Sequence, residues 1–327
     1  MTKRPLGRWA LALLLPFALF AAACGDDDDD ATDTGGDTTT GGDGGGEAAC
    51  SAATAPDDAP EITIGAQDFG ESKILAEIYK QCFEAAGYNV SIQELGGFRD
   101  LEVPAFENGD INFAPEYAAS MLEFLNDFAG EATSDVDETV GLLNDQLGDK
   151  DLVALDASEA VDTNSFVVTQ DTSDELGLTT LSDLADHQDL TLGAPADCEA
   201  NAFCLPGLQD VYGVDLSDGF TALETGAIAD ALDAGAIDIA LLFSTDSRIV
   251  ANGWVLLEDD QTMLAADNIL PVLSTELNDV EGLADLANAV SASLTTENVT
   301  EMNGKFDVDH EDADAIAEEF LADAGLV

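Results

Sequence analysis

The residue types that usually carry catalysis are scarce in this sequence. Of its 327 residues only two are histidines, His187 and His310, and five are cysteines. Neither a GxSxG segment nor a CxxC pair occurs. A catalytic nucleophile needs a base beside it, and a structural zinc site needs closely spaced thiols and imidazoles. We therefore expect no enzyme activity, no metal and no cofactor.

Four of the cysteines are predicted to be structural. Cys198 and Cys204 bracket the short segment CEANAFC and are expected to pair. Cys50 and Cys82 are then left for a second bridge, and an even number is what disulfides in an exported protein require. A metal site is the alternative interpretation, but the spacing of the cysteines and the two histidines does not favour it.

The first residues have the pattern of an export signal. Three basic residues, Lys3, Arg4 and Arg8, precede the apolar stretch 9–20, and the small residues 21–23 lead to Cys24. Such a stretch is too short for a membrane span and favours cleavage. Residues 1–23 are therefore predicted to be a signal peptide. Cys24 resembles the lipid-modified cysteine of bacterial lipoproteins; an ordinary signal with an incidental cysteine is the alternative.

The segment that follows has almost nothing to bury. Residues 24–59 consist mainly of Gly, Asp, Thr and Ala, without an aromatic or large aliphatic side chain. Such a segment stays flexible and repels itself. We interpret it as a disordered acidic tether that holds a domain off the outer side of the cell membrane, with the lipid as the only membrane contact.

Negative charge is the most extreme property of the composition. The chain has 68 acidic and nine basic residues, a formal net charge of −59. Residues 60–327 alone contain 57 acids and six bases, a net charge of −51. No basic patch could neutralise phosphates, so nucleic acid is excluded as a partner. Charge repulsion on this scale is relieved by salt, which suggests adaptation to a salty medium.

From residue 61 onward, short apolar strands alternate with helices. The pattern predicts that the strands are joined by helices into mostly parallel sheets covered on both faces. About 268 residues are more than one core usually holds, so two lobes are expected. Strands are expected at 62–65, 89–93, 111–113, 165–169, 190–193, around 220 and at 237–243. Helices are expected at 74–86, 101–107, 181–185, 205–212, 228–234, 280–294, 296–303 and 312–324.

Several segments, in order and with matching spacing, resemble one known family. They are ITIGAQDFGESKILAEIY at 62–79, LGGFRDLEVPAFENGDINFAPEY at 95–117, TTLSDLADH at 179–187, LPGLQDVYGVD at 205–215, FSTDSRIVANGWVLLEDD at 243–260 and FDVDHED at 306–312. Residues 61–327 thus resemble the osmoprotectant-binding proteins of ABC importers for glycine betaine, choline, carnitine and proline betaine.

The resemblance implies a type II periplasmic-binding fold with a ligand cleft between two lobes. Lobe one would contain residues 60–162 and 266–327, and lobe two residues 163–265. The lobes would close over a small amine or zwitterion, a hinge motion known for periplasmic binding proteins. The closed protein, expected to be a monomer, would then dock on the permease subunits.

A quaternary ammonium ligand is held by the negative faces of aromatic rings or by a carboxylate. Tyr117 matches the tyrosine of the family's PEY motif, so it is the first candidate. Phe69, Gly70 and Glu71 occupy a strand-to-helix loop, where backbone amides could receive a ligand carboxylate. The next such loop contains Phe98 and Arg99. The remaining candidates are Asn201, Phe203, Phe243, Thr245 and Asp267.

At three places the sequence departs from the family's pattern. Ala118-Ala119-Ser120 follows PEY where the family has Thr-Gly-Thr, Asn201 stands where some relatives have an arginine, and Asp267 stands where a tyrosine often occurs. Asp267 could pair with a cation directly. Arg99 could bind a ligand carboxylate, although a salt bridge is the commoner role in so acidic a domain. A receptor for an amino acid or another small polar solute and an acidic, cation-binding surface lipoprotein are the alternative functions.

Overall fold

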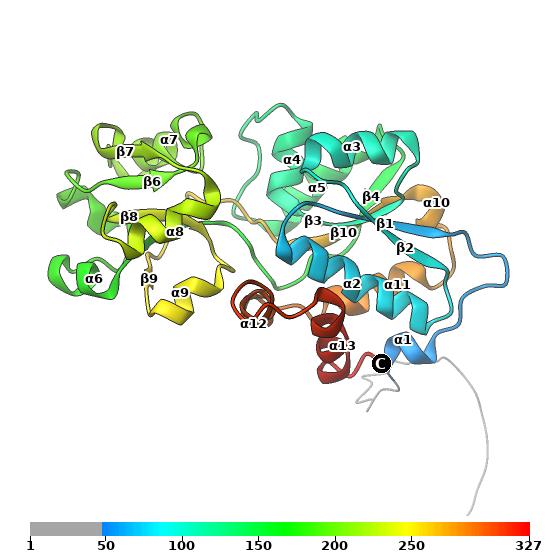
Figure 1. Cartoon of the computed structure of the whole chain (residues 1–327). Helices are drawn as coiled ribbons and strands as arrows, with labels where there is room; N and C mark the ends of the chain where they lie inside the picture. The colour runs from blue at the N-terminus through cyan, green and yellow to red at the C-terminus, as the bar shows by residue number, and fades with distance from the viewer. Residues whose placement is uncertain (1–47) are drawn as a thin grey trace, which may run out of the picture. The chain divides into compact units, whose positions relative to one another are not determined.

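The computed structural model describes residues 48–327 and contains two five-stranded sheets (Figure 1). The first sheet has the order β2-β1-β3-β10-β4. Its strands are β1 (Ile62–Ala66), β2 (Val90–Glu94), β3 (Phe113–Tyr117), β4 (Leu152–Ala154) and β10 (Ile269–Ser274). The accompanying helices are α1 (Ala49–Ala52), α2 (Gly70–Ala85), α3 (Arg99–Asn108), α4 (Ala118–Leu125), α5 (Val136–Gly148), α10 (Thr275–Asn278), α11 (Leu283–Ser291), α12 (Thr296–Asp307) and α13 (Ala313–Asp323).

The second sheet has the order β7-β6-β8-β5-β9. Its strands are β5 (Asn164–Val168), β6 (Leu192–Ala194), β7 (Phe220–Ala222), β8 (Ile239–Phe243) and β9 (Val255–Leu256). Its α-helices are α6 (Gln170–Leu176), α7 (Leu205–Gly207), α8 (Thr225–Asp233) and α9 (Ser247–Asn252). Shorter helical segments are η1 (Leu181–Asp186), η2 (Ala196–Glu199), η3 (Leu208–Tyr212) and η4 (Ser217–Gly219).

Each sheet contains one reversed strand. β10 pairs antiparallel with both β3 and β4, and β5 pairs antiparallel with both β8 and β9. The other four strands of each sheet therefore run in one direction, as the mostly parallel prediction required. Both reversed strands directly follow a passage of the chain from one sheet to the other, at residues 155–163 and 257–268. Each passage thus delivers the reversed strand of the sheet that it enters; the sequence pattern had marked β5, expected at 165–169, but not β10.

Alternation along the strands places apolar side chains on both faces of the first sheet. Phe113 and Tyr117 of β3 pack in the cluster formed with α2, α11, α12 and α13, whereas Ala114 packs in the cluster formed with α3, α4 and α5. Successive side chains of a strand point to opposite faces. Glu116 consequently lies on the α3 side and Tyr117 on the α2 side, which separates two networks described below.

Two details differ from the sequence-based expectations. The segment predicted to be tether is ordered at its end: Ala49–Ala52 form α1, Cys50 is fully buried, and its N–H donates to the Leu326 carbonyl at 2.8 Å. The bridge and this hydrogen bond order a segment whose own composition could not. Helix α3 also begins earlier than expected, so Pro104 lies inside it rather than in its first turn. The ring leaves the Asp100 carbonyl without its intrahelical donor.

Both predicted disulfides are present. Cys50 is bonded to Cys82 of α2, and Cys198 to Cys204 within the segment before α7. All four of these cysteines are buried. The first bridge spans 32 residues and the second only six, so the two should differ in how strongly they restrict the unfolded chain.

Replacing Cys50 and Cys82 together with serine is expected to cost more stability than replacing Cys198 and Cys204. The loop-entropy relation gives about 4 kcal/mol for a loop of the first size and about 2 kcal/mol for one of the second. Urea denaturation of the two double variants under oxidising conditions measures the difference. Equal losses, or a larger loss for the short loop, would show that the bridges act mainly through the native state.

All six basic residues in the described part of the chain are in ion pairs. The pairs are Lys73–Asp68, Lys80–Glu77, Arg99–Glu116, Lys150–Glu107, Arg248–Asp246 and Lys305–Glu319. The remaining acids therefore have no basic side chain left to neutralise them. Between residues 48 and 327, no helix is long and apolar enough to cross a membrane.

This charge imbalance predicts a stability that rises with salt. Screening of the excess carboxylates should raise the melting temperature of residues 48–327 by several degrees between dilute buffer and molar sodium chloride. Differential scanning calorimetry at both salt concentrations tests this, with potassium chloride as a control for ion identity and sucrose for osmotic effects. A melting temperature that stays constant or falls in salt contradicts the interpretation.

Candidate functional site

Three predicted site segments meet at one edge of the first sheet. Phe69 and Glu71 follow β1, Phe98 and Arg99 follow β2, and Tyr117 ends β3. These three strands are parallel neighbours, so their carboxyl ends lie side by side. Ligands of open α/β sheets bind at this edge.

The rings of Phe69, Phe98 and Tyr117 form a continuous group, which we call the ring cluster. The centroids of Phe69 and Phe98 are 6.1 Å apart with an interplanar angle of 20°, and those of Phe69 and Tyr117 are also 6.1 Å apart, at 38°. Phe98 is 56% exposed, Phe69 half-buried and Tyr117 buried. Phe98 therefore presents ring surface to solvent, while Tyr117 forms the inner end of the cluster.

Arg99 is committed to a buried carboxylate. Its Nε and Nη2 atoms donate to Glu116 Oε2 at 3.0 and 2.6 Å, and Glu116 is fully buried. Gln67 Nε2 and the Tyr117 N–H also donate to Glu116, each at 2.8 Å. The Arg99 guanidinium carbon lies 5.8 Å from the centroid of the Tyr117 ring. The structure thus places Arg99 in the salt bridge that the sequence favoured and against one face of the candidate tyrosine.

Glu71 is the centre of a second network, on the other face of β3. The Tyr117 hydroxyl donates to Glu71 Oε1 at 2.6 Å, and Asn303 Nδ2 of α12 donates to Glu71 Oε2 at 2.6 Å. Thr245 Oγ1, from the loop after β8, lies 2.8 Å from Glu71 Oε2 and 2.7 Å from Asp162 Oδ1. This network joins the first sheet, a passage between the sheets and the second sheet.

Burial governs the acid–base state of this second network. Removal from water raises the pKa of Glu71, against the opposing effect of hydrogen bonds from Tyr117, Asn303 and Thr245. Burial and the nearby Glu71 carboxyl raise the pKa of Asp162 well above its usual range. Burial and Glu71 also raise the pKa of Tyr117 well above its usual range. The Tyr117 hydroxyl therefore stays protonated and donates a hydrogen bond to Glu71.

Asp267 lies in the second passage between the sheets and is buried. The Ser120 N–H and hydroxyl donate to its two oxygens at 2.9 and 2.6 Å. Burial raises the pKa of Asp267, and the Ser120 hydroxyl and Arg99 oppose that rise. Ser120 thus uses one lone pair on each of the two Asp267 oxygens. Each oxygen has a further lone pair that Ser120 does not use.

A buried acid without hydrogen bonds completes the surroundings of Arg99. Neither side-chain oxygen of Glu102, a fully buried residue of α3, has a hydrogen-bond partner. Burial, followed by the Glu116 charge, raises the pKa of Glu102 well above its usual range. Together with the acids above, five buried carboxyl groups surround Arg99 and Tyr117: Glu102, Glu116 and Asp267 face the guanidinium, and Glu71 and Asp162 face the tyrosine. We call these five residues the acid group.

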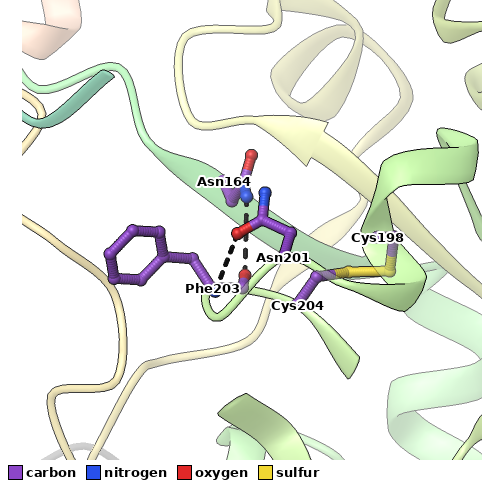
Figure 2. The surroundings of a disulfide bond; sticks show 5 residues. All are labelled: Asn164, Cys198, Asn201, Phe203 and Cys204. Atoms are coloured by element: carbon purple, nitrogen blue, oxygen red, sulfur yellow. Dashed lines mark hydrogen bonds between the residues drawn. A yellow bond between two sulfur atoms is a disulfide. The ribbon is translucent and has the colours of Figure 1, made fainter. Parts of the chain in front are cut away.

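The other predicted site residues have different surroundings. Gly70, at the start of α2, lies against α12. A Cβ on this residue would lie 2.6 Å from the ring of Phe306, so the absence of a side chain lets the two helices pack closely. Asn201 Oδ1 accepts the Phe203 N–H at 2.8 Å inside the disulfide loop, and the Phe203 ring points away from the disulfide (Figure 2). That ring packs on the apolar cluster of α3, α4 and α5. Phe243 ends β8 and is 47% exposed.

Sequence reasoning missed four members of the two networks. Glu116 was visible inside the PEY motif, although only its neighbour Tyr117 was singled out. Gln67, Asp162 and Asn303 carried no signal, because a single acid or amide among so many polar residues looks the same in a site or on the surface. In the part of the chain that the structure describes, no group of three or more His, Cys, Asp or Glu side chains is arranged to hold a metal.

Two sheets with one reversed strand each, linked by two passages of chain, define the class of type II solute-binding proteins. Comparison with known proteins gives the family. Residues 60–323 match the substrate-binding domain of the ABC-type glycine betaine transport system, and the chain belongs to this family. It is accordingly a solute-binding component of an ABC importer.

Individual relatives agree with this assignment. The carnitine transport binding protein OpuCC of Listeria monocytogenes is 27% identical over 276 residues, which cover 80% of this chain and 85% of the relative. The glycine betaine-binding protein YehZ of Escherichia coli is 25% identical over 281 residues, or 82% and 92% of the two chains. These relatives are transport binding proteins.

Solved structures show the same fold. The structure of a glycine betaine/carnitine/choline ABC transporter protein has a TM-score of 0.71 at 25% identity and covers 80% of this chain and 98% of that one. A choline-binding protein in complex with choline has a TM-score of 0.58 at 15% identity and covers 82% of this chain and 90% of that one.

Proposed function

We propose that the ring cluster and Asp267 bind a small quaternary ammonium compound between the two lobes. Stacked rings at the carboxyl ends of three parallel strands, beside buried acids, are the observation that supports this proposal most directly. A methylated ammonium cannot donate a conventional hydrogen bond, so ring faces and carboxylates are its attractive surroundings, at about 0.5–2 kcal/mol for each ring. Relatives named for carnitine and glycine betaine support the same ligand class.

We further propose that a net cation such as choline binds more tightly than a zwitterion such as glycine betaine. A ligand carboxylate would need a guanidinium, hydroxyl or amide donor. Two of the donor nitrogens of Arg99 are already used by Glu116, and the hydroxyls of Tyr117 and Thr245 point to acids. The acid group also contains more carboxyl groups than the single Arg99 can neutralise, and each one that is ionised attracts positive charge and repels a ligand carboxylate.

A calorimetric and thermal-shift screen tests both statements. Choline, glycine betaine, carnitine, proline betaine and ectoine are compared at constant ionic strength, with sodium chloride as the blank and tetramethylammonium as the bare head group. At 100 times the dissociation constant, bound ligand should stabilise the protein by about 2.7 kcal/mol. If none of these compounds binds, the ligand class is wrong. If zwitterions bind more tightly than choline, the charge argument is wrong. An amino acid that shifts the melting temperature instead would identify the alternative receptor.

Phe98 offers a sharper test of the site itself. Phe98→Leu removes the exposed ring and should weaken choline binding by about 0.5–1 kcal/mol while leaving the fold intact. Phe128→Leu is the matched control, because Phe128 is also an exposed phenylalanine, 75% accessible, and lies outside the ring cluster. Equal affinities of both variants and the wild type would place the ligand elsewhere.

The membrane anchor and the cellular location of the domain are also proposals. Residues 1–47, which contain the predicted signal and Cys24, lie outside the described residues. We propose that Cys24 is the lipidated first residue of the mature chain, that the domain faces the outside of the cell membrane, and that it acts as a monomer without catalysis. The proposed lobes, residues 60–162 with 266–327 and residues 163–265, would close on the ligand and dock on the permease. Intact mass of the native protein tests the anchor: an unmodified Cys24 contradicts it.

A further inference from the structure

The Thr245 hydroxyl lies between the carboxyl groups of Glu71 and Asp162, and its single hydrogen serves two short contacts. Thr245 Oγ1 lies within hydrogen-bond distance of two carboxyl oxygens, one on Glu71 and one on Asp162. A threonine hydroxyl has one hydrogen and can donate it only once. The other short contact is a hydrogen bond only if its carboxyl group carries a proton and donates to the threonine oxygen. We call Glu71, Thr245 and Asp162 the joint; its two contacts are both full hydrogen bonds only when the two carboxyl groups hold one acidic proton between them.

We propose that Glu71 and Asp162 hold one proton between them on either side of Thr245, and that Glu71 in this joint is the positioning residue for Tyr117. The argument for the shared proton stands on the contacts and burial of these three residues. The consequence for ligand binding rests on the proposed function, because it assumes that Tyr117 belongs to the ligand site.

The surroundings leave the two carboxyl groups no other neutralising charge. The charged groups that face Glu71 and Asp162 are Asp307 of α12 and Asp267 in the second passage, both acids. Tyr117 on β3 and Asn303 on α12 face Glu71 as neutral donors. Glu71, Asp162 and Thr245 are each at most 8% exposed. Two ionised carboxylates at this place would repel each other with little water to screen them, which is why a shared proton is favoured.

The joint also determines which hydrogen-bonding groups Tyr117 can offer. Its single hydroxyl hydrogen is used by Glu71 Oε1, so the phenolic oxygen presents only lone pairs elsewhere. A ligand hydroxyl can donate to it, whereas a ligand carboxylate cannot receive a hydrogen bond from it. Glu71 thereby connects Tyr117 of the first sheet to the Thr245 loop of the second sheet. It sets both the position of the Tyr117 ring and the direction of its hydroxyl hydrogen bond.

The sign of the pH effect follows from the raised pKa values of Glu71 and Asp162 in the folded state. An acid that is harder to ionise when folded favours the folded state at low pH and loses that advantage as pH rises above the usual carboxyl range. For one linked proton, the folding equilibrium constant falls by up to about tenfold for each pH unit until the folded pair has ionised.

Ligand-free unfolding in urea between pH 5 and 9 is the first measurement. Glu71→Gln imitates the protonated acid, and Asp162→Asn does the same for its partner, so both variants should lose less stability than the wild type as pH rises. Asp260→Asn is the matched control, because Asp260 is an acid of the same domain outside the joint, and its profile should follow the wild type. Identical profiles for all four proteins would overturn the shared proton.

Affinity for choline at neutral pH is the second measurement. Glu71→Gln keeps an oxygen that can accept from Tyr117 and should bind within about threefold of the wild type. Glu71→Ala removes that acceptor and should bind about tenfold more weakly or worse, with circular dichroism showing that it folds. Equal affinity of the two variants would overturn the positioning role. If the wild type itself binds none of the screened amines, the proposed function fails, while the unfolding profiles still decide the proton.

Discussion

Replacing Tyr117 with alanine is expected to weaken binding of the amine ligand by about 1–3 kcal/mol, or roughly five- to 150-fold. The substitution removes the inner ring of the ring cluster, which contacts Phe69 and lies against Arg99. It also withdraws the hydroxyl that donates to Glu71 at 2.6 Å. Loss of ring surface and loss of this donor act in the same direction, because both loosen the edge on which the ligand would lie.

Tyr117→Phe separates the two contributions. The phenylalanine keeps the ring but leaves Glu71 Oε1 without its donor, so we expect a loss of about 0.5–1.5 kcal/mol, smaller than that of the alanine variant. Tyr212→Phe is the matched control, since the Tyr212 hydroxyl also donates to an acid, Asp259, away from the ring cluster. Titration calorimetry of the three variants decides the matter. Alanine and wild-type proteins that bind equally well would remove Tyr117 from the site.

The sequence was sufficient where function depends on local order along the chain. β1 and α2 were predictable because Ile74, Leu75, Ile78 and Cys82 recur at helical spacing directly after an apolar strand. Two parallel strands that are each followed by a loop must present those loops at one edge of the sheet. The neighbourhood of Phe69 and Phe98 follows from that rule, and the PEY motif added Tyr117.

Contacts between distant parts of the chain were beyond sequence reasoning. Glu71 meets Thr245 across 174 residues and Asn303 across 232. Nothing in a single sequence distinguishes the acid at such a junction from the many acids that remain in water. The reversed directions of β5 and β10 could not be predicted for a related reason: a strand's direction depends on where the chain re-enters a sheet. α1 was missed because a disulfide and the chain's other end order it.

The Arg99–Glu116 pair should be the most stability-sensitive polar contact of the first sheet. Arg99→Met is expected to lower the free energy of unfolding by about 3 kcal/mol, because it leaves Glu116 buried without its cation. The value belongs at the lower end of the usual range, since Gln67 and the Tyr117 N–H still donate to Glu116. Burial raises the pKa of the neighbouring Glu102 well above its usual range, so Glu102 adds little negative charge beside Glu116.

A double-mutant cycle identifies the cause of that loss. Glu116→Gln combined with Arg99→Met replaces the ion pair with neutral groups of similar size, and we expect the double variant to recover most of the stability lost by Arg99→Met alone. Lys150→Met provides the control, because its pair with Glu107 is exposed and should contribute at most about 1 kcal/mol. Urea unfolding of the wild type, the Arg99→Met and Glu116→Gln single variants, the double variant and Lys150→Met supplies the free energies. A loss below about 1 kcal/mol for Arg99→Met would mean that Glu116 does not depend on Arg99 for its stability; Arg99 would then be available to a ligand carboxylate, and zwitterions should compete with cations at the ring cluster.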